Sequence, residues 1–197
     1  MKPIKTYHKN GELRAYCHEL NAKIHGEYKQ WHPNGELNIH SHYVNGQLHG
    51  EYKAWHQNGQ LSSHRHFVDG QLNGEYKRWY DTGQLYLHTN YEHGQYHGEY
   101  KEWHQNGQLA IHTHYEHGQL NGEYKNWYDN GQLYMHTNYE HGQLHGEYKQ
   151  WNKQGNLTTN TFWVYNQEVT DEVDKLVTNR YNITQQERTL IKLAVGC

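Results

Sequence analysis

Histidine is the residue type best suited to chemistry in this chain, which contains 20 of them in 197 residues. One set recurs every 24 residues and forms a column: His40, His64, His88, His112 and His136. In three repeats a second histidine follows two residues later: His42, His66 and His114. On a strand, residues i and i+2 share a face about 7 Å apart, and equivalent strands of successive hairpins lie about 9.5 Å apart.

These spacings bear on metal binding, because a zinc site needs three or four converging ligands. Two histidines at i and i+2 can share an ion only by leaning together, so we assign no metal ligands. Weak nickel or zinc binding by the columns is an alternative. The simpler interpretation is a solvated polar face on which His, Glu and Lys alternate and contact one another across strands.

No motif of an enzyme active site is present. The chain contains neither a Gly-rich phosphate loop followed by Lys and Ser or Thr nor a Gly-x-Ser-x-Gly sequence. Carboxylates such as Glu27 and Glu51 recur in every full repeat, whereas an active site is usually singular. We therefore predict that the protein is not an enzyme, with no catalytic residues and no cofactor.

Composition restricts the class of partner. The formal net charge is −3, so we expect no binding to nucleic acid. The only cysteines, Cys17 and Cys197, do not form a disulfide framework. The first ten residues contain no apolar run, so we expect neither a signal peptide nor a transmembrane segment, and a cytoplasmic location.

The elements that carry these side chains repeat every 24 residues. Gly-Glu-Tyr-Lys occurs six times, starting at residues 26, 50, 74, 98, 122 and 146. A tryptophan follows each time: Trp31, Trp55, Trp79, Trp103, Trp127 and Trp151. Such a period indicates a repeat array. We divide the chain into seven repeats over 2–169 and a C-terminal segment over 170–197.

Each repeat contains two glycine turns, one Asn-Gly (as at 34–35) and one X-Gly (as at 45–46). Asn-Gly between alternating runs indicates a type I′ hairpin turn. Two turns in 24 residues leave two strands of about eight residues. We therefore predict an all-β fold, a single-layer, curved antiparallel meander of stacked hairpins with about 14 strands.

The turns also predict the cross-strand register. A two-residue loop at 45–46 gives three pairs, Tyr43 with Leu48, Ser41 with Gly50, and His40 with Glu51. The loop at 34–35 gives two more, Tyr28 with Ser41 and Lys29 with His40. On this register Gly50 leaves room for neighbouring tyrosine rings.

Trp31 does not fit this division, because strict alternation places it on the polar face. A bulge before the turn would reverse it.

Residues 170–197 lack the repeat and carry helix signals. Thr170 is a suitable N-cap for a helix over 171–180, and Thr184 with Glu187 forms a capping box for a second one. We expect a helical cap over the last strand, since an open sheet edge invites aggregation. A docking helix for a partner is the alternative.

The repeat G-E-Y-K-x-W-x-x-N-G-Q-L resembles the MORN (membrane occupation and recognition nexus) repeat family. It is closer to the variant class in bacterial proteins described as antitoxin components and in giant viruses of amoebae. The resemblance implies a curved sheet of hairpins used as a scaffold for proteins or, in older proposals, phospholipids. Here the residues after the turns are Gln, His and Asn rather than Lys, which disfavours anionic lipid.

We therefore predict a non-enzymatic scaffold that binds an unidentified protein or peptide. The expected interaction surface combines the six tryptophans with the column of His40, His64, His88, His112 and His136. The alternatives are an antitoxin-like inhibitor of a partner protein and a weak lipid- or metal-binding surface. Self-association and peripheral membrane contact are left open.

Overall fold

The computed structural model describes residues 1–169, and the helical cap predicted over 170–197 lies outside them. The chain divides into two compact units. The N-terminal unit comprises Met1–Gly98 with Gln105–Gly107, and the C-terminal unit comprises Glu99–His104 with the chain from Gln108 onward.

The N-terminal unit contains eight complete strands in chain order. They are β1 Lys2–Tyr7, β2 Leu13–Leu20, β3 Lys23–Trp31, β4 Leu37–Val44, β5 Gln47–Trp55, β6 Leu61–Val68, β7 Gln71–Trp79 and β8 Leu85–Glu92. Strand β9, Gln95–Trp103, begins in this unit and ends in the other one.

The C-terminal unit continues the same alternation of strand and turn. Its further strands are β10 Leu109–Glu116, β11 Gln119–Leu120, β12 Gly122–Trp127, β13 Leu133–Glu140, β14 Gln143–Trp151, β15 Leu157–Val164 and β16 Gln167–Glu168. The count exceeds the expected 14 because one strand is split into β11 and β12 and because β16 starts a further pairing.

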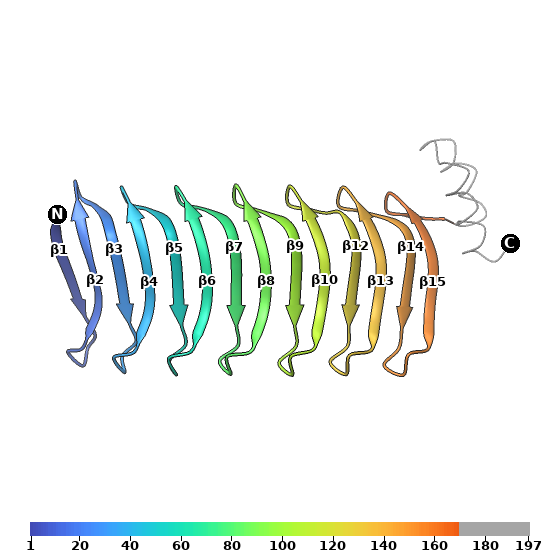
Figure 1. The fold of residues 1–197 in the computed structure, drawn as a ribbon, viewed down its shortest axis with the longest axis horizontal. Coiled ribbons are helices and arrows are strands. Elements are labelled where there is room, and N and C mark those ends of the chain that lie inside the picture. The colour runs from blue at the N-terminus through green and yellow to red at the C-terminus, as the bar shows by residue number, and fades with distance from the viewer. Residues whose placement is uncertain (170–197) are drawn as a thin grey trace. The chain divides into compact units, whose positions relative to one another are not determined.

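Within each unit every strand pairs in antiparallel fashion with its neighbour in sequence, which confirms the predicted meander. Figure 1 shows β1 to β8 side by side in chain order, with turns that join successive strands at alternate ends. Residues 1–169 contain no helix, hence none that could cross a membrane.

The Asn-Gly turns do not have the predicted type I′ geometry. In the 34–35 turn, Gly35 N–H donates to the carbonyl of His32 (2.9 Å), and only Gly35 has positive φ (+86°). This is a type I turn with Pro33 at its second position and glycine at its last. The type I′ geometry occurs at the X-Gly turns, where Asn45 (+52°) and Gly46 (+86°) both have positive φ.

The register is correct beside the X-Gly turn but changes in the middle of the strand. Tyr43 pairs with Leu48, as predicted, but Ser41 pairs with Tyr52 and not with Gly50. Two extra residues of β5 lie between these pairs, and Gly50 has φ +84° there. His40 consequently pairs with Lys53, not with Glu51.

The explanation predicted for Gly50 is also wrong. A Cβ atom added to Gly50 would meet nothing within 4 Å, so the glycine does not leave room for a ring. Its φ of +84° is a left-handed backbone conformation that L-residues with a Cβ rarely adopt. Glycine is required here by the bulge in the backbone.

A second bulge lies next to the type I turn. Tyr28 pairs with Ser41 and Lys29 with His40, as predicted, and Gln30 pairs with Ile39, but Trp31 pairs with Leu37. The extra residue, Asn38, is therefore on β4. Because Trp31 still alternates with Gln30 along β3, the bulge moves Leu37, and not Trp31, to the other face.

Neighbouring repeats are tied together by hydrogen bonds at both ends of the strands. At the type I′ turn, Gly46 N–H donates to the carbonyl of Ile24 (2.8 Å), one repeat earlier. At the type I turn, Asn34 Nδ2 donates to the carbonyl of Gln57 (3.0 Å), one repeat later. These ties fix the stacking of hairpins through groups that recur in most repeats.

Packing within each unit occurs between rings and small side chains of one face. Ser41 lies between Tyr28 and Tyr52 across three strands, and it is 3% exposed. Equivalent buried residues are Thr89, Thr113 and Thr137. Each tyrosine meets the ring that follows the small residue, as Tyr28 meets Tyr43 edge-on with centroids 5.7 Å apart. Rings therefore replace the thick aliphatic core of a two-layer domain.

Candidate binding faces

The two faces of the sheet differ in chemistry within each unit. The first, here called the histidine face, carries the Glu and Lys of Gly-Glu-Tyr-Lys and the histidine column. The second, here called the tyrosine face, carries the Tyr of the same motif. The alternation of side chains along each strand separates the two sets.

On the histidine face five of the six glutamates of the motif hold two partners, a lysine and a histidine. Lys29 Nζ lies 2.8 Å from Glu27, and His40 Nε2 donates to the same carboxylate at 2.9 Å. The lysine is two residues along the same strand, and the histidine lies directly opposite that lysine on the next strand.

This Lys–Glu–His cluster occurs five times. Its histidine-to-glutamate contacts measure 2.8–3.4 Å and join His40–Glu27, His64–Glu51, His88–Glu75, His112–Glu99 and His136–Glu123. The last repeat keeps the ion pair of Lys149 and Glu147 (2.7 Å) but has Asn160 in the column.

The clusters keep their carboxylates charged. The hydrogen bond from Lys29 lowers the pKa of Glu27 below its ordinary value, and the bond from His40 lowers it further. Equivalent lysines lower the pKa of Glu51, Glu75 and Glu123 for the same reason. Each cluster therefore presents a cation and an anion together, and not a basic patch.

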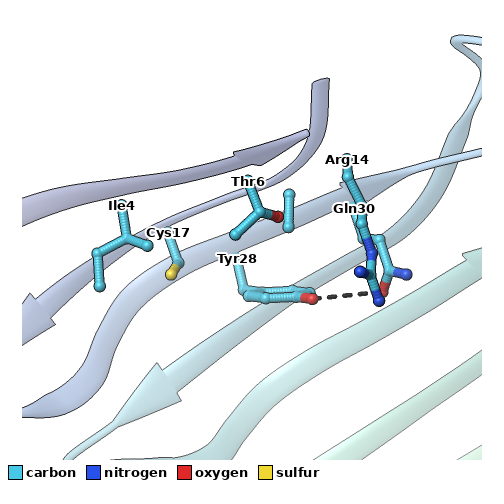
Figure 2. Close-up of a pocket in the computed structure, with 7 residues that line it drawn as sticks. Ile4, Thr6, Arg14, Cys17, Tyr28 and Gln30 are labelled. Atoms are coloured by element: carbon cyan, nitrogen blue, oxygen red, sulfur yellow. Dashed lines mark hydrogen bonds between the residues drawn. The ribbon is translucent and has the colours of Figure 1, made fainter. Parts of the chain in front are cut away.

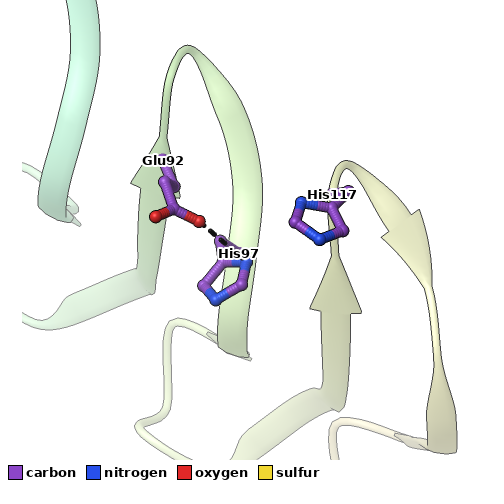
Figure 3. A group of neighbouring side chains, drawn as sticks. All are labelled: Glu92, His97 and His117. Atoms are coloured by element: carbon purple, nitrogen blue, oxygen red, sulfur yellow. Dashed lines mark ion pairs between the residues drawn. The ribbon is translucent and has the colours of Figure 1, made fainter.

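Several histidines outside the column form contacts at the turns. His32 Nε2 donates to the carbonyl of Trp55 at 3.0 Å, one repeat later, and Tyr128 makes the equivalent bond to Trp151 at 3.1 Å. At the opposite turns, histidine contacts a carboxylate, as Figure 3 shows for His97 Nδ1 and Glu92 at 3.4 Å.

The tyrosine face is neutral over most of its area. Burial is the main cause that raises the pKa of Tyr28, Tyr43, Tyr124 and Tyr139 above the ordinary phenol value. These hydroxyls therefore stay protonated and act as hydrogen-bonding groups. All three arginines of residues 1–169 contact this face: Arg14, Arg65 and Arg78.

One pocket of about 320 Å³ opens on the tyrosine face beside β1. Figure 2 shows Ile4, Thr6 and Cys17 along one side, with Arg14 beside Gln30. Tyr28 hydroxyl donates to Gln30 Oε1 at 3.3 Å inside it. Burial raises the pKa of the Cys17 thiol, which disfavours the reactive thiolate.

Of the predicted interaction surface, the histidine column forms the recurring clusters described above, and the tryptophans are not part of them. The column from His40 to His136 joins the Lys–Glu–His clusters, whereas the six tryptophans are half-buried beside the turns. Sequence reasoning missed the pairing of each lysine with the glutamate two residues earlier. It also missed Arg65, although a charged residue in a column of Ser and Thr was a readable signal.

Comparison with known protein families gives one match. A family model described as MORN repeat variant matches residues 24–45, 48–69, 72–93, 96–117 and 120–141, more than half of the chain. No curated protein matches the chain.

Proposed function

The chain belongs to the MORN repeat variant family, whose repeats generally form protein- or membrane-binding scaffolds, and we propose that it is a non-catalytic scaffold for an extended protein segment. The segment binds across the strands of the histidine face, over the Lys–Glu–His clusters and the neighbouring tryptophans.

The regular recurrence of the clusters carries this proposal. Equivalent strands lie two strands apart, about 9.5 Å, and a polyproline II segment advances about 3.1 Å per residue. Every third residue of such a segment therefore meets the same cluster in the next repeat. A periodic array of identical polar groups suits a periodic ligand better than a single small molecule.

The ion pairs favour a protein over an anionic membrane. Attraction to anionic lipid needs unpaired lysines near the surface, whereas lysines of this face lie 2.6–2.8 Å from glutamate oxygens. Binding through hydrogen bonds to both charges is more specific than attraction to a uniform negative surface.

The test is capture of a partner from an extract of the source cells by the full chain. A variant with His40, His64 and His88 replaced by alanine is expected to lose the partner. The matched control replaces the turn histidines His93 and His141 by asparagine, which the equivalent turn at position 45 already contains.

Equal capture by the column variant and the wild type would contradict the proposal. Capture of a single small protein whose activity the chain inhibits would instead support the antitoxin-like function. Recovery of the chain with lipid vesicles, with the same dependence on the column, would favour the membrane alternative.

A further inference from the structure

The tyrosine face of the N-terminal unit contains one position that breaks the repeat. Where other repeats have Ser41, Thr89 or Cys17 between two tyrosine rows, β6 has Arg65. Its guanidinium carbon lies 4.5 Å from the ring centre of Tyr52 and 5.4 Å from that of Tyr76. The two rings hold the guanidinium between strands by cation–π contact.

A second arginine lies on the next strand. Arg78 of β7 pairs with Ser63, two residues before Arg65 on β6, so the two arginines are diagonal neighbours on one face. Arg78 lies over the ring of Tyr86 at 5.0 Å, and its Nη1 donates to the Tyr86 hydroxyl at 3.1 Å. We call Arg65, Arg78 and these three tyrosines the arginine patch.

No tyrosine-face position of β5 to β8 carries an acidic side chain that would balance these charges. Apart from the two arginines, the tyrosine-face positions of β5 to β8 are Gly, Ala, Ser, Thr, Leu, Phe or Tyr. Within residues 1–169 neither arginine forms an ion pair, and the buried Nε of Arg65 has no hydrogen-bond partner. The glutamates of these strands, Glu51, Glu75 and Glu92, face the opposite side.

We propose that the arginine patch is a binding site for the carboxylates of an acidic, aromatic-containing peptide segment of a partner protein. This site lies on the face opposite to the Lys–Glu–His clusters and goes beyond the scaffold function proposed above. The guanidinium groups pair with carboxylates in fork geometry. The tyrosine rings contact the apolar side chains between those carboxylates.

Charge complementarity selects a short peptide over a polyanion. Nucleic acid and anionic membranes gain affinity by neutralising many lysines and arginines over an extended surface. Here only two arginines lie together, in a chain of net charge −3. Two carboxylates a few residues apart match that supply of positive charge.

The rings also prepare the site for binding. A guanidinium stacked between Tyr52 and Tyr76 has already lost much of its rotamer freedom and the water over its faces. Binding therefore orders fewer side chains at the moment of contact, which raises affinity. The N–H groups at its edge remain for the ligand.

The probe is a fluorescein-labelled peptide of three Glu-Tyr pairs, with a Gln-Tyr peptide as its uncharged match, measured by anisotropy at pH 8. The full chain is expected to bind the Glu-Tyr peptide about tenfold or more tightly than its match. The double variant Arg65→Thr with Arg78→Asn should abolish that preference. Both replacements occupy the same register positions in other repeats, at Thr89 and Asn126.

A relocation experiment separates loss of the site from loss of the fold. Adding Thr137→Arg and Gln150→Arg to the double variant places the first arginine between Tyr124 and Tyr148 and the second opposite Met135, in an equivalent register. The peptide preference should return. Lys9→Gln with Lys23→Gln, which removes the same charge from exposed positions outside the clusters and the arginine patch, should leave binding unchanged.

Three results would overturn the proposal. The first is unchanged peptide preference in the Arg65 and Arg78 double variant. The second is equal loss in the lysine control, which would show non-specific attraction. The third is tighter, arginine-dependent binding of labelled oligo-dT or phosphatidylserine vesicles, which would assign the patch to another ligand class.

Discussion

Gly50 provides a direct test of the physical reason for the repeated glycine. Its φ is +84°, and a Cβ at this position would meet nothing within 4 Å. Left-handed backbone costs an L-residue about 1–2 kcal/mol. Gly50→Ala should therefore destabilise the chain by about 1–2 kcal/mol, which lowers Tm by about 2–8 °C for a chain of this size.

The series Gly50→Asn, Gly50→Ala and Gly50→Val separates backbone strain from lack of space. Asparagine tolerates the left-handed region, so its loss should be the smallest, and valine should be the worst because a branched Cβ disfavours positive φ. Lys53→Ala, whose side chain is only in an exposed ion pair with Glu51, is the control and should change stability by less than about 1 kcal/mol.

Thermal and urea unfolding of the four variants decide the question. The reasoning is refuted if asparagine is as damaging as valine, since both would then respond to side-chain volume alone. It is refuted equally if alanine leaves the midpoint unchanged.

Three further predictions concern the clusters and the turns. The hydrogen bond from Lys53 lowers the pKa of Glu51 in the folded chain, so the ionised carboxylate contributes stability at pH values above its unfolded pKa of about 4.3. That contribution is lost as the pH falls through the lower folded pKa. At pH values below about 4.5, Tm should therefore decrease, and it should decrease less steeply in a variant with Glu27, Glu51 and Glu75 changed to Gln. Asn58→Ala removes the bond to the carbonyl of Asp81 (2.7 Å) and the acceptor for Gln60 N–H (3.1 Å), and urea unfolding should show a loss of about 1–2 kcal/mol. Asn58→Thr loses the bond to Asp81 but can keep the acceptor, as Thr82 does, so it should lose less; unchanged stability in Asn58→Thr would contradict the tie between repeats. His56→Phe should destabilise by about 0.5–1.5 kcal/mol because Nε2 no longer donates to the carbonyl of Trp79 (3.0 Å), whereas His56→Tyr should be close to neutral in thermal melts, since Tyr128 makes the equivalent bond.

The alternation of side chains and the position of turns were readable from the sequence. The 24-residue period and two glycine turns per repeat predicted the antiparallel meander that both units contain. They also predicted the pairs Lys29–His40 and Tyr43–Leu48 beside the turns. Both results depend on local rules, because strand side chains alternate with a period of two and a short loop fixes the adjacent register.

The choice between turn types needed the structure. Asn-Gly is compatible with more than one turn, and the bond between His32 N–H and the carbonyl of Glu36 (2.8 Å) closes a three-residue loop around 33–35. The X-Gly turn adopts type I′ even with histidine at position 93, where φ is +49°. Hydrogen bonds to the preceding repeat, such as Gly94 N–H to Leu72 (2.8 Å), hold that conformation in place.

The partner of each charged side chain was decided by the bulges. Strict alternation pairs His40 with Glu51, but the extra residues at Gly50 shift β5 so that Lys53 faces His40 and Glu27 becomes its carboxylate partner. A glycine adopts either sign of φ at little cost, so the presence of a glycine in the sequence does not by itself predict a bulge. Most of the composition of each face follows from the sequence, whereas the contacts within it depend on where the tertiary structure inserts extra residues.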